Sequence, residues 1–223
     1  MQVKQQAEKG ALGHIYHAKA GWVRRKGIPG WGTWFTQMDK SGGGPLIDLG
    51  VHMLDLSLYL MGNPKPVSVY GATYAEFGPR KKGIGSWGAP NWNGHYDVED
   101  LATALIKMDN GATLSLDVSW AALVDTDNQP YVQLLGSEGG ASIRGAKGKL
   151  MAEMFDREAD VELSIPDRDE GSRVRMAKHF LACIRDGAAP ITSVMTGYTN
   201  NLILDAIYRS SQTGREVQLN WDI

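Results

Sequence analysis

The chain has 223 residues, of which 43% are hydrophobic and 22% charged, and its 23 basic and 25 acidic residues give a formal charge of −2. This composition is typical of a globular protein, and the lack of a basic stripe argues against a nucleic-acid partner. The N-terminal residues show no apolar signal segment, no apolar run reaches the roughly 18 residues of a membrane span, and a single Cys183 excludes an intramolecular disulfide. We therefore expect a cytoplasmic protein without a membrane segment.

The N-terminal part of the chain predicts a helix, a strand and an aromatic loop. Residues 2–9 are polar and compatible with a short helix, and residues 14–23 alternate as a half-buried strand does. The loop over residues 24–40 is rich in glycine and holds Trp31 and Trp34 close together.

Residues 41–62, SGGGPLIDLGVHMLDLSLYLMG, are the most distinctive stretch of the chain. Three glycines and a proline lead into a run without Lys, Arg or Glu. Ser41 is a candidate N-cap, Pro45 suits a first helical position, and Gly62 is a stop signal, so the stretch predicts one helix.

The polar side chains of this helix fall on one narrow stripe. At the α-helical rotation, the four titratable residues lie within a sector of about 60°; they are Asp48, His52, Asp55 and Tyr59. A helix that is apolar on its other sides is buried. The stripe therefore lines either a polar cleft or a satisfied network in the core.

The remainder predicts a meander of strands followed by two helices. An Asn-Gly pair at 110–111 joins two alternating runs, which is a strong hairpin signal. The expected strands cover 66–74, 98–108, 112–120, 131–135, 141–144, 149–155 and 161–165, and the expected helices cover 173–184 and 196–211. Without repeated βαβ units, this order predicts an α+β fold with a mixed or antiparallel sheet and helices on one face. The other face would be open to a partner subunit.

A G-x-G-x-x-G string occurs at Gly83, Gly85 and Gly88, within a long irregular segment over residues 76–96. A dinucleotide fingerprint needs a strand before it and a helix after it, because the helix N-terminus holds the pyrophosphate. Neither context is present here. We interpret the string as a loop feature and expect no cofactor to bind this chain.

The pair Asp48 and His52 admits several interpretations. Side chains one helical turn apart can converge on one ligand, and an imidazole is the usual proton shuttle for oxidising an alcohol or reducing a carbonyl. The same spacing fits a buried Asp–His pair that only ties the helix to its neighbours. A third possibility is a metal site that also uses Asp55, although no other part of the sequence supports it.

The tryptophans beside this helix are candidates for a sugar-binding wall. Indole rings pack well against the C–H face of a sugar, and Trp31 and Trp34 precede the helix closely in sequence. Tryptophans are more often core or interface residues, so this pattern alone leaves both interpretations open.

The string GGGPLIDLGVHMLDLSLYLMG at 42–62 resembles the signature of the glucose–fructose oxidoreductase/inositol dehydrogenase/rhizopine-catabolism (Gfo/Idh/MocA) family. Its specific features are the three glycines and the ordered Asp, Gly, His and Asp. Other similar segments are VEDLATALIKMDNGATLSLDVSW at 98–120, LLGSEGGASI at 134–143, HFLACIRDGAAPITS at 179–193 and AIYRSSQTGREV at 206–217. The resemblance spans nearly the whole chain but only the C-terminal domain of the family.

The resemblance implies that residues 1–223 form one substrate-binding and oligomerisation domain, with a large, mainly antiparallel open sheet like the C-terminal domain of glyceraldehyde-3-phosphate dehydrogenase. It implies that His52 is the catalytic acid/base and that Asp48 binds or orients a substrate hydroxyl. The substrate would be a sugar, inositol or related polyol, with a wall that adds Lys19, Trp22 and Arg24 to the two tryptophans above.

The family's full-length enzymes use NAD or NADP, bound by an N-terminal Rossmann domain that also carries a catalytic lysine in a Glu-Lys-Pro motif. Neither feature occurs in this sequence, so this chain alone is expected to be inactive and to need that domain as a partner. A homo-oligomer would form through the open sheet face. The alternative is a non-catalytic module that binds carbohydrate or supports oligomerisation.

Overall fold

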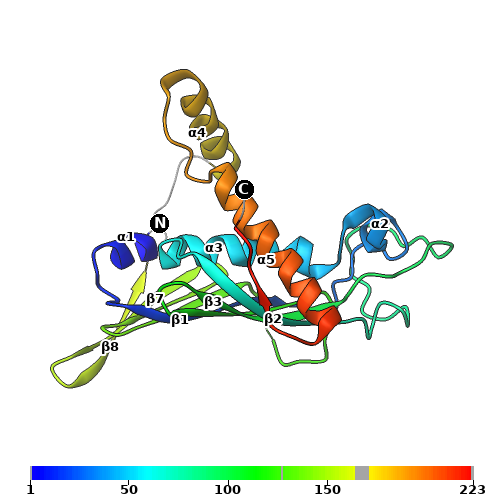
Figure 1. Ribbon diagram of the computed structural model, residues 1–223, viewed down its shortest axis with the longest axis horizontal. Coiled ribbons are helices and arrows are strands. Elements are labelled where there is room, and N and C mark those ends of the chain that lie inside the picture. The colour runs from blue at the N-terminus through cyan, green and yellow to red at the C-terminus, as the bar shows by residue number, and fades with distance from the viewer. Residues whose placement is uncertain (1, 127, 164–170, 222–223) are drawn as a thin grey trace.

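The computed structural model describes residues 2–126, 128–163 and 171–221 as one open sheet with helices on one side (Figure 1). Nine strands follow the order β8-β7-β6-β5-β1-β4-β3-β2-β9. All neighbours pair antiparallel except β1 and β4, which are parallel. The strands are β1 Ile15–Val23, β2 Pro66–Tyr74, β3 Leu101–Met108, β4 Thr113–Ser119, β5 Tyr131–Gly136, β6 Gly140–Arg144, β7 Lys147–Met154, β8 Arg157–Leu163 and β9 Val217–Gln218. The α+β prediction is confirmed, as is the hairpin of β3 and β4.

The helices lie along the same face of the sheet. They are α1 Gln2–Glu8, α2 Met38–Ser41, α3 Val51–Met61, α4 Ser172–Asp186 and α5 Val194–Thr213, with a short 3-10 turn η1 at Trp34–Thr36. The core lies between α3, α5 and the central strands, where Leu54, Ile106 and Ile207 are fully buried. The expected strand over 161–165 ends at Leu163 in the structure, and its last two residues lie outside the described part. Every described helix is too short or too polar to span a lipid bilayer.

The helix predicted over residues 41–62 is in fact built from separate pieces. Ser41 ends α2 instead of capping the next helix, and its hydroxyl bonds the carbonyls of Gln37 and Gly43. A π-helical turn, η2 at Leu46–Gly50, then runs directly into α3. In a π turn the hydrogen bond spans five residues instead of four, and such turns are frequent at functional sites. The turn therefore rotates His52 relative to Asp48 from the position that a regular α-helix would give it.

A buried carboxylate from a distant strand end holds the start of this helical stretch. Glu99 accepts hydrogen bonds from the backbone N–H groups of Gly44 at 3.0 Å and Leu46 at 2.9 Å, and from the Tyr208 hydroxyl at 3.0 Å. A carboxylate at a helix N-terminus accepts hydrogen bonds from the first backbone N–H groups, and its negative charge interacts favourably with the positive end of the helix dipole. Burial, together with the negative charge of Glu99, raises the pKa of Tyr208, so this hydroxyl remains a donor.

The glycines before the helix are required by close contacts. A Cβ on Gly44 would lie 2.1 Å from the Glu99 carbonyl oxygen, and a Cβ on Gly43 would lie 1.9 Å from the Tyr208 hydroxyl. Both distances are far below van der Waals contact. The glycine triplet thus lets the chain approach Glu99 and α5 closely enough to form the anchor.

The long segment over residues 76–96 packs against the loop over residues 27–37. Backbone hydrogen bonds join Gly27 and Ile28 to the carbonyl of Gly83, and Gly30 to the carbonyl of Trp87. A Cβ on Gly85 would lie 2.9 Å from the Cα of Gly27. The G-x-G-x-x-G string therefore serves close packing of two loops, in agreement with our interpretation of it as a loop feature.

Candidate active site

Asp48 lies inside the π turn and is held by a tryptophan from the end of β4. The Trp120 indole Nε1 donates a hydrogen bond of 2.8 Å to Asp48 Oδ2. Trp120 is fully buried, whereas Asp48 is only half-buried. One carboxylate oxygen is thus fixed by the core, and the group stays accessible to a ligand.

Arg24 is the cation beside this carboxylate. It follows β1, and its guanidinium lies 4.3 Å from the ring centroid of Trp22, a cation–π contact. Burial lowers the pKa of Arg24, while the charge of Asp48 opposes that shift. The structure therefore brings three of the predicted site residues together, namely Arg24, Trp22 and Asp48.

His52 lies on the first turn of α3, directly after the π turn, and its side chain is exposed. No described residue forms a hydrogen bond or ion pair with it. An exposed imidazole beyond an anchored carboxylate has the freedom to exchange protons with a bound alcohol.

The last two residues of the polar stripe, Asp55 and Tyr59, contact neighbouring helices. The Asn200 side-chain amide on α5 donates a 3.2 Å hydrogen bond to Asp55 Oδ1, and Lys4 on α1 lies 5.1 Å from the ring centroid of Tyr59. These contacts tie α3 to α5 and α1. Across the described residues, no group of three or more His, Cys, Asp or Glu side chains is placed to hold a metal ion.

The other predicted wall residues differ in their accessibility. Trp34 is 56% exposed, but Trp31 is only 4% exposed and donates a 2.7 Å hydrogen bond to the carbonyl of Gly78. Lys19 is exposed between the buried Ala18 and Ala20, so strand alternation directs it away from the helices. Trp34 thus has ring surface for a ligand, Trp31 has little, and Lys19 lies across the sheet from Asp48.

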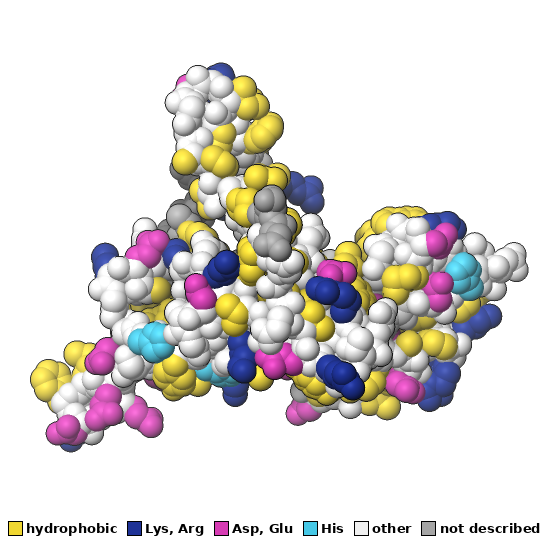
Figure 2. Space-filling model, viewed as in Figure 1, with side chains coloured by type: hydrophobic (Ala, Val, Ile, Leu, Met, Phe, Trp, Pro, Cys, Tyr) yellow, Lys and Arg dark blue, Asp and Glu magenta, His cyan; other side chains and the backbone are white. Residues whose placement is uncertain are grey.

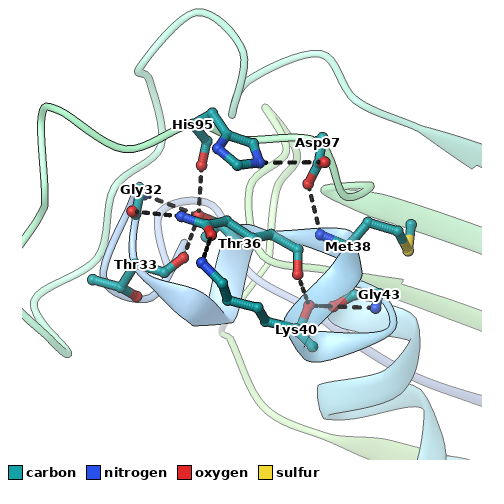
Figure 3. Close-up of polar contacts among 10 residues, drawn as sticks. Gly32, Thr33, Thr36, Met38, Lys40, Gly43, His95 and Asp97 are labelled. Atoms are coloured by element: carbon teal, nitrogen blue, oxygen red, sulfur yellow. Dashed lines mark hydrogen bonds and ion pairs between the residues drawn. The ribbon is translucent and has the colours of Figure 1, made fainter.

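A network of polar contacts clamps the aromatic loop beside α2 (Figure 3). The buried Thr36 hydroxyl donates to the His95 carbonyl at 3.3 Å and accepts from the Gly32 N–H at 2.9 Å. Asp97 accepts a 2.6 Å hydrogen bond from the Met38 N–H and lies 3.5 Å from the His95 ring. The loop that carries Trp34 is therefore fixed in place.

Two residues important to the site were missed in the sequence analysis, Trp120 and Glu99. Each lies far from its partner in the sequence: Trp120 is 72 positions from Asp48, and Glu99 is 55 positions from Gly44. The signal that could have identified them is their place at the ends of the β3–β4 hairpin, where strand ends meet the helix.

We expect Trp120→Phe to weaken the binding of a sugar at Asp48, because phenylalanine keeps an aromatic ring but removes the indole N–H that holds Oδ2. Loss of one hydrogen bond to a charged group corresponds to about 1.5–3 kcal/mol. Isothermal titration with a sugar ligand measures the effect, and Trp92→Phe, an exposed indole, is the control. Unchanged affinity in Trp120→Phe would show that Asp48 needs no fixed orientation.

Comparison with known proteins identifies relatives of this chain and of its fold. Residues 1–142 match the GFO/IDH/MocA C-terminal domain. The D-glucoside 3-dehydrogenase of Escherichia coli is 33% identical over 98% of this chain and 60% of its own length. The D-apiose dehydrogenase of Paraburkholderia graminis is 25% identical over 86% of this chain and 52% of its own. Levoglucosan dehydrogenase, solved with NADH and L-sorbose, has a TM-score of 0.82 at 22% identity, covering 98% of this chain and 62% of its own.

The matched residues 1–142 identify the chain as a C-terminal domain of this family. The chain belongs to the Gfo/Idh/MocA family, as the resemblance in the sequence indicated. It spans about 60% of the length of the Escherichia coli relative.

Proposed function

We propose that this chain is the substrate-binding domain of an NAD(P)-dependent oxidoreductase that acts on a sugar, inositol or related polyol in the cytoplasm. The observation that carries the proposal is the carboxylate of Asp48, fixed by Trp120 and placed one π turn before an exposed His52. The names of the relatives, which are glucoside, apiose and inositol dehydrogenases, support this substrate class.

Each residue has a distinct part in this proposal. The second carboxylate oxygen of Asp48 accepts a hydrogen bond from a substrate hydroxyl and holds it in register. His52 removes the proton of the hydroxyl that is oxidised, or returns it in the reverse direction. Arg24 offers donors to neighbouring oxygens, and the indoles of Trp22 and Trp34 pack on apolar C–H surface.

The proposed enzyme also needs a binding site for its nicotinamide cofactor. The glycines at positions 83–88 lie in a loop against another loop, and the described residues contain no strand–turn–helix unit of the dinucleotide type. We therefore assign nucleotide binding to a Rossmann domain that completes the enzyme. On this proposal the chain alone does not turn over substrate.

Helix α4 offers a surface for that Rossmann domain. None of its residues is buried, and one side exposes five apolar residues, Val174, Met176, Phe180, Leu181 and Ile184. The helix projects from the helical face of the sheet, and its apolar side chains are visible in Figure 2. About 40% of the length of the Escherichia coli relative lies outside the match, and we assign the cover of this helix to the corresponding part of the complete enzyme.

The open face of the sheet is the candidate surface for a homo-oligomer. Tyr70 on β2 and Leu105 on β3 are direct cross-strand partners, and both side chains are exposed opposite the buried Val69 and Ile106. This pair lies on the second and third strands from the β9 edge of the sheet, and adjacent exposed apolar side chains are a candidate interface patch.

The test is sugar binding to the chain itself. We expect methyl β-D-glucoside or a related sugar to bind with millimolar affinity, and we expect Asp48→Asn to weaken that binding about tenfold, because the amide loses the negative acceptor. Asp39→Asn, at an exposed carboxylate on α2, is the matched control. Isothermal titration that finds equal affinities for both variants would contradict the proposal.

A further inference from the structure

Three aromatic rings form an exposed surface next to Asp48. Phe35 contacts Trp34 at a centroid distance of 4.6 Å, Trp87 at 5.3 Å and the buried Trp120 at 5.9 Å. Trp34 and Trp87 are 56% and 65% exposed. We call Trp34, Phe35 and Trp87 the aromatic shelf. Ring contacts run from Trp120, the hydrogen-bond donor to Asp48, through Phe35 to the two exposed indoles.

The shelf is built from two loops that support each other. Trp34 and Phe35 lie in the turn η1, and Trp87 lies in the long segment over residues 76–96. The Gly30 N–H bonds the Trp87 carbonyl at 2.9 Å, and a Cβ on Gly88 would lie only 3.2 Å from the Cα of Gly30. The clamp through Thr36 and Asp97 in Figure 3 fixes the other side. Exposed indoles therefore sit on a preorganised support.

The position of the shelf indicates the size of its ligand. Phe35 contacts both exposed indoles and Trp120, whereas neither exposed indole makes a ring contact with Trp120. Trp120 is fully buried, so a sugar ring bound by Asp48 and His52 would lie beside the partly buried Phe35, and the exposed indole faces lie farther along the same series of ring contacts. Aromatic faces attract apolar C–H surface, and large exposed apolar patches mark binding sites.

We propose that the aromatic shelf is a second subsite, which binds the ring attached to the reacting sugar through a glycosidic bond. The preferred substrate is then a glycoside with a cyclic aglycone or a disaccharide, in preference to a free monosaccharide. This inference rests on the proposed function of Asp48 and His52, and it adds the substrate class that their site selects.

The experiment compares ligands that share the first ring and differ in the second. Isothermal titration of the chain uses methyl β-D-glucoside against cellobiose, and methyl β-D-galactoside against lactose. In whichever of these two pairs binds, we expect the disaccharide to bind about fivefold more tightly than the methyl glycoside. A fivefold gain in affinity corresponds to one to two aromatic contacts. Trp87→Ala should reduce that advantage and leave the affinity for the methyl glycoside unchanged, and Trp34→Ala should also reduce that advantage.

The matched control is Trp92→Ala. Trp92 is an equally exposed indole of the same segment, but it stacks on Trp31 at 5.7 Å instead of on Phe35, so we expect it to leave the preference intact. Equal affinity for disaccharide and methyl glycoside would overturn the subsite while leaving the proposed function in place. Failure of all four sugars to bind would contradict the proposed function and the subsite with it. If Trp34→Ala and Trp87→Ala instead reduce self-association in sedimentation, the shelf is a protein contact and the proposal is wrong.

Discussion

Replacing His52 by alanine should lower the turnover of the complete enzyme about 10²- to 10⁴-fold and leave its nucleotide affinity nearly unchanged. The imidazole is exposed, and no described residue bonds to it, so its removal costs the fold little. What the variant loses is the group that exchanges a proton with the substrate hydroxyl. Steady-state kinetics gives the turnover, and fluorescence titration gives the nucleotide affinity.

The control for this experiment is His14→Ala, at another exposed histidine, which lies just before β1. We expect its turnover to match the unaltered enzyme. Equal losses of turnover and nucleotide affinity in His52→Ala would indicate a structural role and count against the assignment.

Gly44→Ala should destabilise the chain by about 1–3 kcal/mol or more. The new Cβ would lie 2.1 Å from the Glu99 carbonyl oxygen, where backbone must move to make room. Movement there also disturbs the Gly44 and Leu46 N–H bonds to the Glu99 carboxylate. Because these bonds hold the start of the π turn, sugar binding at Asp48 should fall as well. Urea unfolding and isothermal titration measure the two effects.

Gly197→Ala is the matched control, since Gly197 lies within α5 and a Cβ there would meet no atom within 4 Å. We expect that variant to gain about 0.5–1 kcal/mol, because alanine loses less conformational freedom in a helix than glycine does. If Gly44→Ala is as stable as the unaltered chain, then Glu99 does not anchor the helix as described.

Local patterns predicted the strands and the hairpin well. The alternating runs correspond to β3 and β4, and the Asn110-Gly111 pair lies in the turn between them. β2 has the predicted bounds. Helical spacing placed Asp48 and His52 on the helical stretch, and the resemblance to the Gfo/Idh/MocA signature added the roles that we propose for them. These predictions depend on neighbours in sequence, which periodicity and turn chemistry report directly.

The π turn and the long-range anchors could not be predicted in this way. Hydrophobic periodicity does not distinguish a π turn from an α turn over five residues, so the stretch was predicted as one helix. Trp120 donates its hydrogen bond to Asp48, and Glu99 accepts one from Gly44. Both bonds depend on how the ends of the hairpin meet the helix, which only the tertiary structure determines. The accessibility of Trp31 and the face of Lys19 likewise follow from which side of the sheet the helices cover.

The most direct test of the account is the crystal structure of the chain soaked with a sugar that it binds in titration. The account predicts one sugar ring with a hydroxyl within hydrogen-bond distance of the Asp48 carboxylate and the next hydroxyl toward His52. A sugar bound elsewhere, such as in the cavity of about 300 Å³ lined by Leu58, Met195 and Trp221, with Asp48 and His52 untouched, would contradict it.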